Sequence, residues 1–161
     1  MSRTESTVGL ISDTHGLLRP EAVASLTGAD YIIHAGDIGD ASILKRLSAI
    51  APVTAVRGNN DKGAWTSRIP DREVLQVGAA IIYVIHDVSE LGVDPVAAGF
   101  HAVIFGHSHR PSIESRQEVL FINPGSAGPR RFKLPVSLGW LTVSGTSIKA
   151  RLVELTVGAN A

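Results

Sequence analysis

Residues 8–16 read VGLISDTHG, a compact apolar run followed by aspartate, histidine and glycine. Val8 to Ile11 has the length and composition of a buried β-strand. Asp13 and His15 follow it, so this strand carries a carboxylate and an imidazole at its carboxyl end. Because a spacing of two residues places both side chains on one side of extended backbone, we expect them to converge on one ion.

Strands and helices alternate outward from this stretch through the first half of the chain. A helix is expected where Pro20 and Glu21 open a segment that stops before Gly28, because proline and acidic residues favour the first helical turn. The further expected elements are the strand Tyr31–Ala35, the helix Ala41–Ile50 and the strand Pro52–Val56. Two β-α-β crossovers predict a parallel sheet.

The second half consists mostly of strand patterns joined by turns. The expected elements are the hairpin Glu73–Val77 and Ala80–His86, the short helix Asp94–Gly99, and the strands Ala102–Phe105, Ser112–Ser115, Val119–Ile122, Ser137–Val143 and Ser147–Leu155. This pattern predicts a layered α/β fold with two sheets face to face. We expect a single domain over residues 1–161, with residues 1–6 as a flexible N-terminal tail.

Composition narrows the classes of function. The 161 residues are 44% hydrophobic, enough for a buried core, and lysine plus arginine balances aspartate plus glutamate at 15 each. This balance argues against nucleic acid as a partner. No signal-like segment and no apolar run near about 20 residues is present, which predicts a cytoplasmic protein without a membrane contact. With no cysteine, any metal must be held by oxygen and imidazole.

Polar side chains stand at the ends of five predicted strands, where the sites of open α/β sheets form. The strings are Asp13-x-His15, Gly36-Asp37, Gly58-Asn59-Asn60-Asp61, His86-Asp87 and Gly106-His107-x-His109. The candidate metal ligands are Asp13, His15, Asp37, Asn59, His86, His107 and His109. A carboxylate such as Asp37 can bridge two cations while neutral imidazoles complete their coordination. These strings therefore predict a two-metal site.

Each string has an ordinary structural explanation when it is taken alone. A histidine at a strand end is more often a hydrogen-bonded residue than a ligand, and we assign that role to His34 and His101. Aspartate after a strand is usually a turn or cap residue, and Asp40 fits an N-cap ahead of the helix at Ala41. Five such strings in one short chain are harder to explain as unrelated turns. The joint pattern favours the metal site.

The ordered set, together with Asn123-Pro124-Gly125-Ser126, closely resembles the calcineurin-like metallophosphoesterases, and within them the small bacterial and archaeal single-domain phosphodiesterases. The resemblance implies a four-layer α-β-β-α sandwich of two mixed β-sheets flanked by helices. By the family pattern, one metal is bound by Asp13, His15, Asp37 and His109. The second is bound by Asp37, Asn59, His86 and His107, with Asp37 as the bridge.

The resemblance implies a dinuclear-metal phosphoesterase that hydrolyses a small phosphodiester by in-line attack of a metal-bridging hydroxide. Asp37, Asn59 and His86 would contribute to catalysis by positioning metal and phosphate. The mixture of carboxylate, amide and imidazole favours two Mn²⁺ ions, with Fe, Zn, Co or Ni as alternatives. A catalytically weak metal-binding scaffold like the retromer subunit of the same fold stays open as the alternative function. Apolar patches on the antiparallel half favour a homodimer.

Three features depart from the family pattern or have no assigned role. Asn60 stands where many relatives have a histidine, so the identity of a general acid is open. The loop after His86 runs Asp87-Val88-Ser89-Glu90, which brings negative charge near an anionic substrate unless it pairs with Arg130, Arg131 or Lys133. Those cations are otherwise surface charge. Asp61 is expected to accept hydrogen bonds from a ligand or a loop amide, or to be a turn residue.

Overall fold

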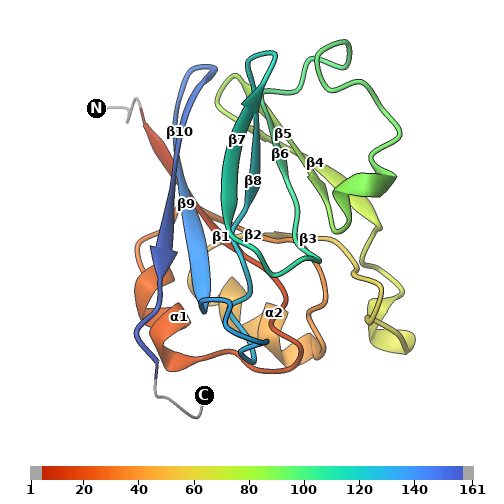
Figure 1. Cartoon of the computed structure of the whole chain (residues 1–161), viewed down its shortest axis with the longest axis vertical. Coiled ribbons are helices and arrows are strands. Elements are labelled where there is room, and N and C mark those ends of the chain that lie inside the picture. Colours follow the sequence, from red (N-terminus) through yellow and green to blue (C-terminus); the bar gives the residue numbers. More distant parts are fainter. Residues whose placement is uncertain (1–4, 158–161) are drawn as a thin grey trace.

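Two mixed five-stranded sheets form the protein, and the computed structural model describes residues 5–157 (Figure 1). The first sheet has the order β10-β9-β1-β2-β3 and the second the order β4-β5-β6-β8-β7. The strands of the first sheet are β1 (Ser6–Ile11), β2 (Tyr31–His34), β3 (Val53–Ala55), β9 (Ser137–Ser144) and β10 (Ser147–Glu154). Those of the second are β4 (Arg72–Val77), β5 (Ala80–Ile85), β6 (Ala102–Ile104), β7 (Ser112–Arg116) and β8 (Val119–Asn123).

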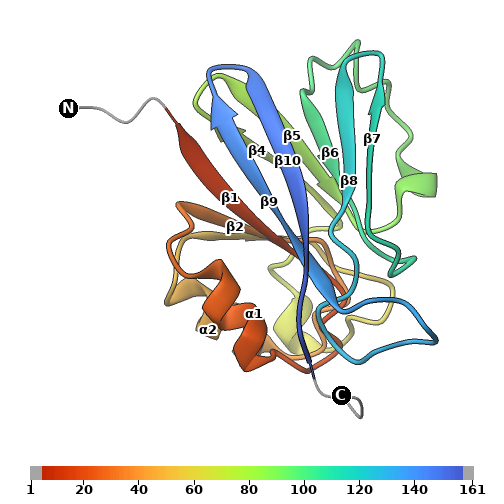
Figure 2. The same cartoon turned by 60° about the vertical axis from the view of Figure 1, so that its left-hand side comes forward.

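The two predicted β-α-β crossovers are confirmed in the first sheet. β1 and β2 pair in parallel and so do β2 and β3, with α1 (Pro20–Leu26) and α2 (Ala41–Ser48) as the connections. Both helices cover the face of this sheet that points away from the second sheet (Figure 2). Asp40 caps α2, because its side chain accepts a hydrogen bond of 2.9 Å from the Ser42 N–H, as predicted.

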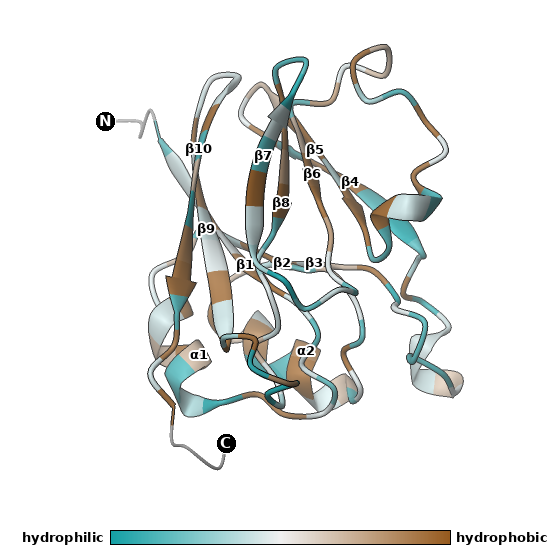
Figure 3. Ribbon diagram, viewed as in Figure 1, coloured by the Kyte–Doolittle hydropathy of each residue, from teal (hydrophilic) through white to brown (hydrophobic). Residues whose placement is uncertain are grey.

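Alternation along β1 explains how the strand is buried on both faces. Val8 and Leu10 point into the core between the sheets, whereas Ile11 packs with the residues of the helices. Gly9 lets α1 pack closely on this strand, because a Cβ there would lie 2.5 Å from Leu26 Cδ2 and would push that side chain aside. The brown β5, β6 and β8 in Figure 3 show the same apolar character in the second sheet.

The sandwich implied by the family is confirmed, with few helices. The segment 88–100, with one 3₁₀ turn at η2 (Val88–Glu90), covers the outer face of the second sheet. Tyr83 of β5 stacks on Phe100 of this segment at a ring-centroid distance of 4.7 Å. Among residues 5–157, no helix is long and apolar enough to cross a membrane.

One predicted element is wrong and one is longer than expected. Residues 94–99 form consecutive turns and no helix: Ala98 N–H bonds Asp94 O at 2.9 Å, but Gly99 turns to φ 80° and ends the pattern after one turn. β1 begins at Ser6 and not at Val8, because the long strand β9 continues its pairing up to Ser6. Residues 1–4 of the predicted tail lie outside the described residues.

Candidate metal centre

Loops at the carboxyl ends of β1, β2, β3, β5 and β6 meet at one edge of the sandwich. Backbone hydrogen bonds join these loops: Asp13 N–H to Gly36 O at 3.0 Å, His15 N–H to Asp37 O at 2.9 Å, and Gly106 N–H to His86 O at 3.0 Å. The loops within each sheet are therefore fixed to one another before any ligand is added. All seven predicted ligand residues lie on these loops.

Left-handed backbone directs most of the candidate side chains inward. Among the described residues, eight non-glycine residues have positive φ, and five of them are candidate ligands. These five are Asp13 (55°), His15 (46°), Asp37 (53°), His107 (73°) and His109 (63°). The extended backbone expected at Asp13 and His15 is therefore wrong, because the chain turns sharply as it leaves its strand. This conformation is costly for residues other than glycine, and such strain concentrates at functional sites.

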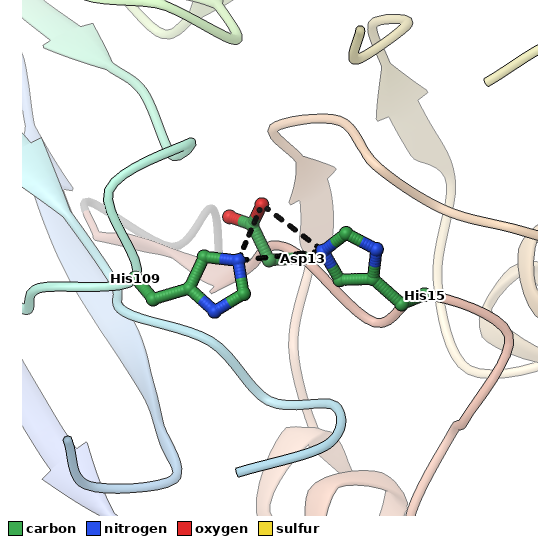
Figure 4. Close-up of side chains that lie close together, drawn as sticks. All are labelled: Asp13, His15 and His109. Carbon is green, nitrogen blue, oxygen red and sulfur yellow. Dashed lines mark hydrogen bonds and ion pairs between the residues drawn. The ribbon is translucent and has the colours of Figure 1, made fainter. Parts of the chain in front are cut away.

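Asp13, His15 and His109 form the first group of ligand atoms, and the three side chains point at one another (Figure 4). Asp13 Oδ1 lies 3.4 Å from His109 Nε2 and 3.7 Å from His15 Nε2. The two Nε2 atoms are themselves 3.3 Å apart. Three atoms that can bind a metal therefore converge on one point.

A second group lies beside the first. His86 Nε2 is 3.3 Å from Asp37 Oδ2 and 3.1 Å from Asn59 Oδ1, which also lies 3.2 Å from His107 Nδ1. His107 and His109 therefore face different groups. Asp37 Oδ2 also lies 3.6 Å from His15 Nε2, so it stands between the two groups.

The tautomer of His86 is fixed by the main chain. Ala35 O lies 2.7 Å from His86 Nδ1, and because a carbonyl oxygen only accepts, Nδ1 carries the proton. The lone pair of a neutral His86 is then on Nε2, the atom that faces Asp37 and Asn59. The ring is thus oriented as a ligand by a partner outside the group.

The environment of the two carboxylate oxygens of Asp13 indicates whether a cation fits the first group. Oδ2 accepts from Ser12 Oγ at 2.6 Å and from His107 N–H at 3.2 Å, whereas Oδ1 is buried without a hydrogen-bond partner. Leaving a carboxylate oxygen buried and unpaired is unfavourable. Since Oδ1 faces imidazole nitrogens, a cation at this point would remove that penalty. The residues therefore fit a divalent metal.

The charges of the site agree with this fit. Burial raises the pKa of Asp13, but the nearby imidazoles of His109 and His15 outweigh it and hold the pKa well below its usual range. Burial likewise raises the pKa of Asp37, and its contacts with His86 and Asn60 lower it further than burial raises it. Two buried carboxylates thus stay ionised side by side, which favours a bound cation.

Two residues of the Gly58–Asp61 turn support the candidate ligands. Asp61 accepts from the N–H groups of Ile38 at 3.1 Å, Gly39 at 2.9 Å and Gly58 at 2.9 Å, which confirms its predicted contact with loop amides. Asn60 donates to both carboxylate oxygens of Asp37, from its backbone at 2.9 Å and its side chain at 3.1 Å. No local sequence pattern indicates this contact, because it depends on how the loops of Asp37 and Asn60 pack against each other.

His34 and His101 do not join either group, as predicted. The Gly36 N–H donates to His34 Nδ1 at 3.1 Å, so Nε2 carries the proton and donates to Thr14 Oγ1 at 2.9 Å. Burial lowers the pKa of His34 to about 4, and this ring stays neutral. His101 Nδ1 accepts from the Ile81 N–H at 2.9 Å.

The loop after His86 borders a cavity of about 270 Å³ beside Asn59. Asp87 accepts a hydrogen bond from Ser89 Oγ at 2.7 Å, which lowers the pKa of this carboxyl, and its Oδ2 lies 3.8 Å from His107 Nε2. Glu90 lines the same cavity. Within residues 5–157, neither carboxylate pairs with the cations that follow Ser126, so the pairing considered from the sequence does not form.

The sequence comparisons agree with this geometry. The family model described as "Calcineurin-like phosphoesterase superfamily domain" matches residues 7–146, and the chain belongs to this superfamily. A probable metallophosphoesterase of Methanothermobacter thermautotrophicus is 34% identical over 158 residues, which cover 91% of each chain. This relative belongs to the class of enzyme that the geometry of the site suggests.

Two solved structures share the fold at lower sequence identity. A novel archaeal phosphodiesterase superimposes with a TM-score of 0.75 at 23% identity, covering 91% of this chain and 99% of that one. Vacuolar protein sorting 29 of Cryptosporidium parvum superimposes with a TM-score of 0.77 at 18% identity, covering 95% and 99%. At these identities the likeness shows the fold alone, so an enzyme and a sorting protein are equally compatible with it.

Proposed function

We propose that this protein is a dinuclear-metal phosphodiesterase that hydrolyses a small phosphodiester. Family membership supports a metal-dependent phosphoesterase, and the buried, unpaired Oδ1 of Asp13 amid imidazole nitrogens is the observation that carries the metal site. One ion would be held by Asp13, His15, Asp37 and His109. The other would be held by Asp37, Asn59, His86 and His107. Manganese suits this mixture of carboxylate, amide and imidazole ligands.

When bound, two such cations acidify water and neutralise the charge that builds up on phosphoryl oxygens. The protein itself orients the side chains that would bind these cations. Ala35 O holds the ring of His86, and Asn60 holds both oxygens of Asp37, so neither side chain needs to rearrange when substrate arrives. The family's frequent histidine at position 60 is absent, which favours substrates whose leaving group departs without strong acid assistance.

Charge near the site favours a diester over a monoester. Asp87 and Glu90 line the cavity next to His86, and each adds negative charge. A monoester carries up to two negative charges at neutral pH, whereas a diester carries one. Repulsion from the two carboxylates therefore penalises a monoester more.

The test is hydrolysis of bis(4-nitrophenyl) phosphate and of 4-nitrophenyl phosphate by metal-stripped protein reconstituted with Mn²⁺. We expect higher kcat/KM for the diester, and we expect Asp37→Ala and His107→Ala to lose activity and bound metal together. His101→Asn is the matched control, because His101 lies outside both groups and should keep activity. Equal activity in Asp37→Ala and in the unmodified protein would refute the proposal.

A scaffold function is the second candidate, because the fold superimposes well on vacuolar protein sorting 29. Metal content separates the two functions more directly than fold does. Two ions per chain with diester turnover support the enzyme, while fewer ions and no turnover with any of Mn, Fe, Zn, Co or Ni support the scaffold. The cytoplasmic location and the homodimer stay predictions, which imaging of a fluorescent fusion and analytical ultracentrifugation would test.

A further inference from the structure

A connection beside the first ligand group has features that the proposed function does not use. Residues 127–135 link β8 to β9 and project from the sandwich as the blue loop in Figure 2. We call Arg130, Arg131, Phe132 and Lys133 the basic-aromatic loop. It is the stretch in which cations and an exposed aromatic ring follow one another without interruption.

The base of this connection is attached to the segment that carries Asp13. Ser126 Oγ donates to Asp13 O at 2.9 Å, and Ala127 N–H donates to Ser12 O at 3.1 Å. Gly128 packs so closely on the backbone of residues 13 and 14 that a Cβ would overlap their carbonyl oxygens. The buried Arg19 adds two hydrogen bonds to Gly128 O, at 3.2 and 3.0 Å. The basic-aromatic loop is therefore held next to the site.

Phe132 lies at the tip of the loop in an unfavourable state. Its side chain is 88% exposed, the highest value among the exposed large hydrophobic side chains of the described residues. Its φ is 55°, within a turn that Leu134 N–H closes onto Arg131 O at 3.2 Å. Neither exposing an aromatic ring nor placing it in left-handed backbone stabilises the fold. A contact with a ligand would account for both.

The cations around Phe132 are free to bind anions. Arg110, which follows His109, borders a cavity of about 550 Å³ with Phe132, Lys133 and Leu134. Arg110 and the three cations of the loop are exposed, and within residues 5–157 their side chains take part in no ion pair or hydrogen bond with protein. Since the chain as a whole has no net charge, this group is a local concentration of positive charge next to the metal centre.

We propose that the basic-aromatic loop and Arg110 bind the nucleotide part of a phosphodiester substrate, with the base stacked on Phe132 and phosphate oxygens held by the guanidinium and ammonium groups. An aromatic ring beside free cations is the combination that proteins use to hold a base and its phosphate. The place of the loop next to His109 favours a substrate over a membrane surface. The proposal rests on the proposed function, whose substrate class it names.

Binding is measured first, with adenosine 5′-monophosphate as the probe and by isothermal titration calorimetry. The protein used is Asp37→Ala without added metal, so that neither turnover nor a metal-bound phosphate enters the result. We expect Phe132→Ala on this background to weaken binding about tenfold, and Phe132→Trp to retain it. Val74→Ala, which shortens an exposed apolar side chain on β4, is the control and should bind normally.

Turnover is the second measurement, in Mn²⁺-loaded protein with two diesters that share the 4-nitrophenol leaving group. One is 4-nitrophenyl thymidine 5′-phosphate and the other is methyl 4-nitrophenyl phosphate. We expect Phe132→Ala to raise KM about tenfold for the thymidine diester only, with kcat kept. If no diester is hydrolysed but nucleotide binding still depends on Phe132, the enzyme proposal fails and the nucleotide site stands.

Two outcomes overturn the nucleotide site. One is equal nucleotide binding by the Phe132→Ala protein and its parent, with each variant's fold verified by circular dichroism. The other is a protein that binds no nucleotide but sediments with phosphatidylserine vesicles, with this sedimentation lost in Phe132→Ala. That result would assign the loop to an anionic membrane surface.

Discussion

At the scale of single residues, Asp61 shows how a side chain outside both ligand groups determines their shape. Its carboxylate is buried and accepts hydrogen bonds from backbone N–H groups in the loop of Asp37 and from the Gly58 N–H. These contacts hold the second and third strand-end loops together. Three backbone donors depend on this one side chain, and that of Ile38 is buried, so removing the carboxylate leaves a buried N–H group without its partner.

We therefore predict that Asp61→Ala lowers the free energy of unfolding by about 3 kcal/mol and weakens Mn²⁺ binding at least about tenfold. Urea denaturation of the metal-free protein and titration with Mn²⁺ measure the two effects. Glu114→Ala is the control, because Glu114 and its partner Arg116 are exposed, and we expect neither the free energy of unfolding nor the metal affinity to change measurably. A metal affinity that is unchanged in Asp61→Ala contradicts this account.

His34 gives the second prediction at this scale, for the metal-free protein. Burial lowers its pKa from 6.5 to about 4, so the unfolded chain binds a proton more readily than the folded one. The contribution of His34 to the free energy of unfolding is fully present above about pH 6.5. It falls by about 3 kcal/mol in total as the pH decreases to about 4. Urea denaturation across this pH range gives the free energy of unfolding of the unmodified protein and of His34→Gln. The difference between the two values isolates the contribution of His34. Parallel pH profiles for the two proteins rule it out.

The identities of the candidate ligands could be read from the sequence, but their conformations could not. The strings at the strand ends predicted which side chains meet, because topology brings the carboxyl ends of neighbouring strands to one edge. They did not predict the left-handed backbone at Asp13 or His109, since nothing local distinguishes this conformation from extended chain in aspartate and histidine. The contacts of Asn60 with Asp37 likewise depend on how two distant turns pack.

At the scale of elements, the close approach of β1 and β6 decides whether the loops of the two sheets can meet. Gly106 follows β6, and a Cβ there would lie 2.1 Å from Ser12 Oγ and 2.6 Å from Asp13 Oδ2. Both atoms belong to the loop after β1. The absence of a side chain at Gly106 is thus a condition for placing His107 and His109 beside Asp13.

We predict that Gly106→Ala separates these loops, lowers the free energy of unfolding by about 2 kcal/mol and reduces Mn²⁺ affinity. Gly139→Ala is the matched control in β9, where a Cβ would meet its nearest neighbours at an ordinary 3.4 Å. Thermal unfolding and metal titration of the two variants test the difference. If Gly106→Ala binds Mn²⁺ as tightly as Gly139→Ala, the close approach is not needed.

The elements themselves were predicted where pattern and burial agree. β1, β2 and α2 have apolar residues at the period of their structure and pack them on the core, so local sequence and tertiary contacts give the same answer. The predicted helix over residues 94–99 is wrong because these residues have a composition typical of helices but no apolar surface to pack against. Val96, for example, is 48% exposed. The layer over the second sheet depends on such packing, which periodicity alone does not describe.

At the scale of the whole molecule, the metal centre lies where the two sheets meet. Asp13, His15, Asp37 and Asn59 come from loops of the first sheet, and His86, His107 and His109 from loops of the second. Cations bound between them would join the two halves of the sandwich. The unfolded chain offers no such arrangement, so binding favours the folded state.

The last prediction follows from this linkage. Mn²⁺ at about 100 times its dissociation constant should stabilise the protein by about 2.7 kcal/mol, which corresponds to a rise in Tm of about 8 °C for a domain of this size. Differential scanning calorimetry with Mn²⁺ and after chelation by EDTA measures the shift. Asp37→Ala removes the carboxylate shared by both groups and should abolish the rise, whereas His101→Asn should keep it. An equal rise in Asp37→Ala would mean that Mn²⁺ stabilises the protein from another site.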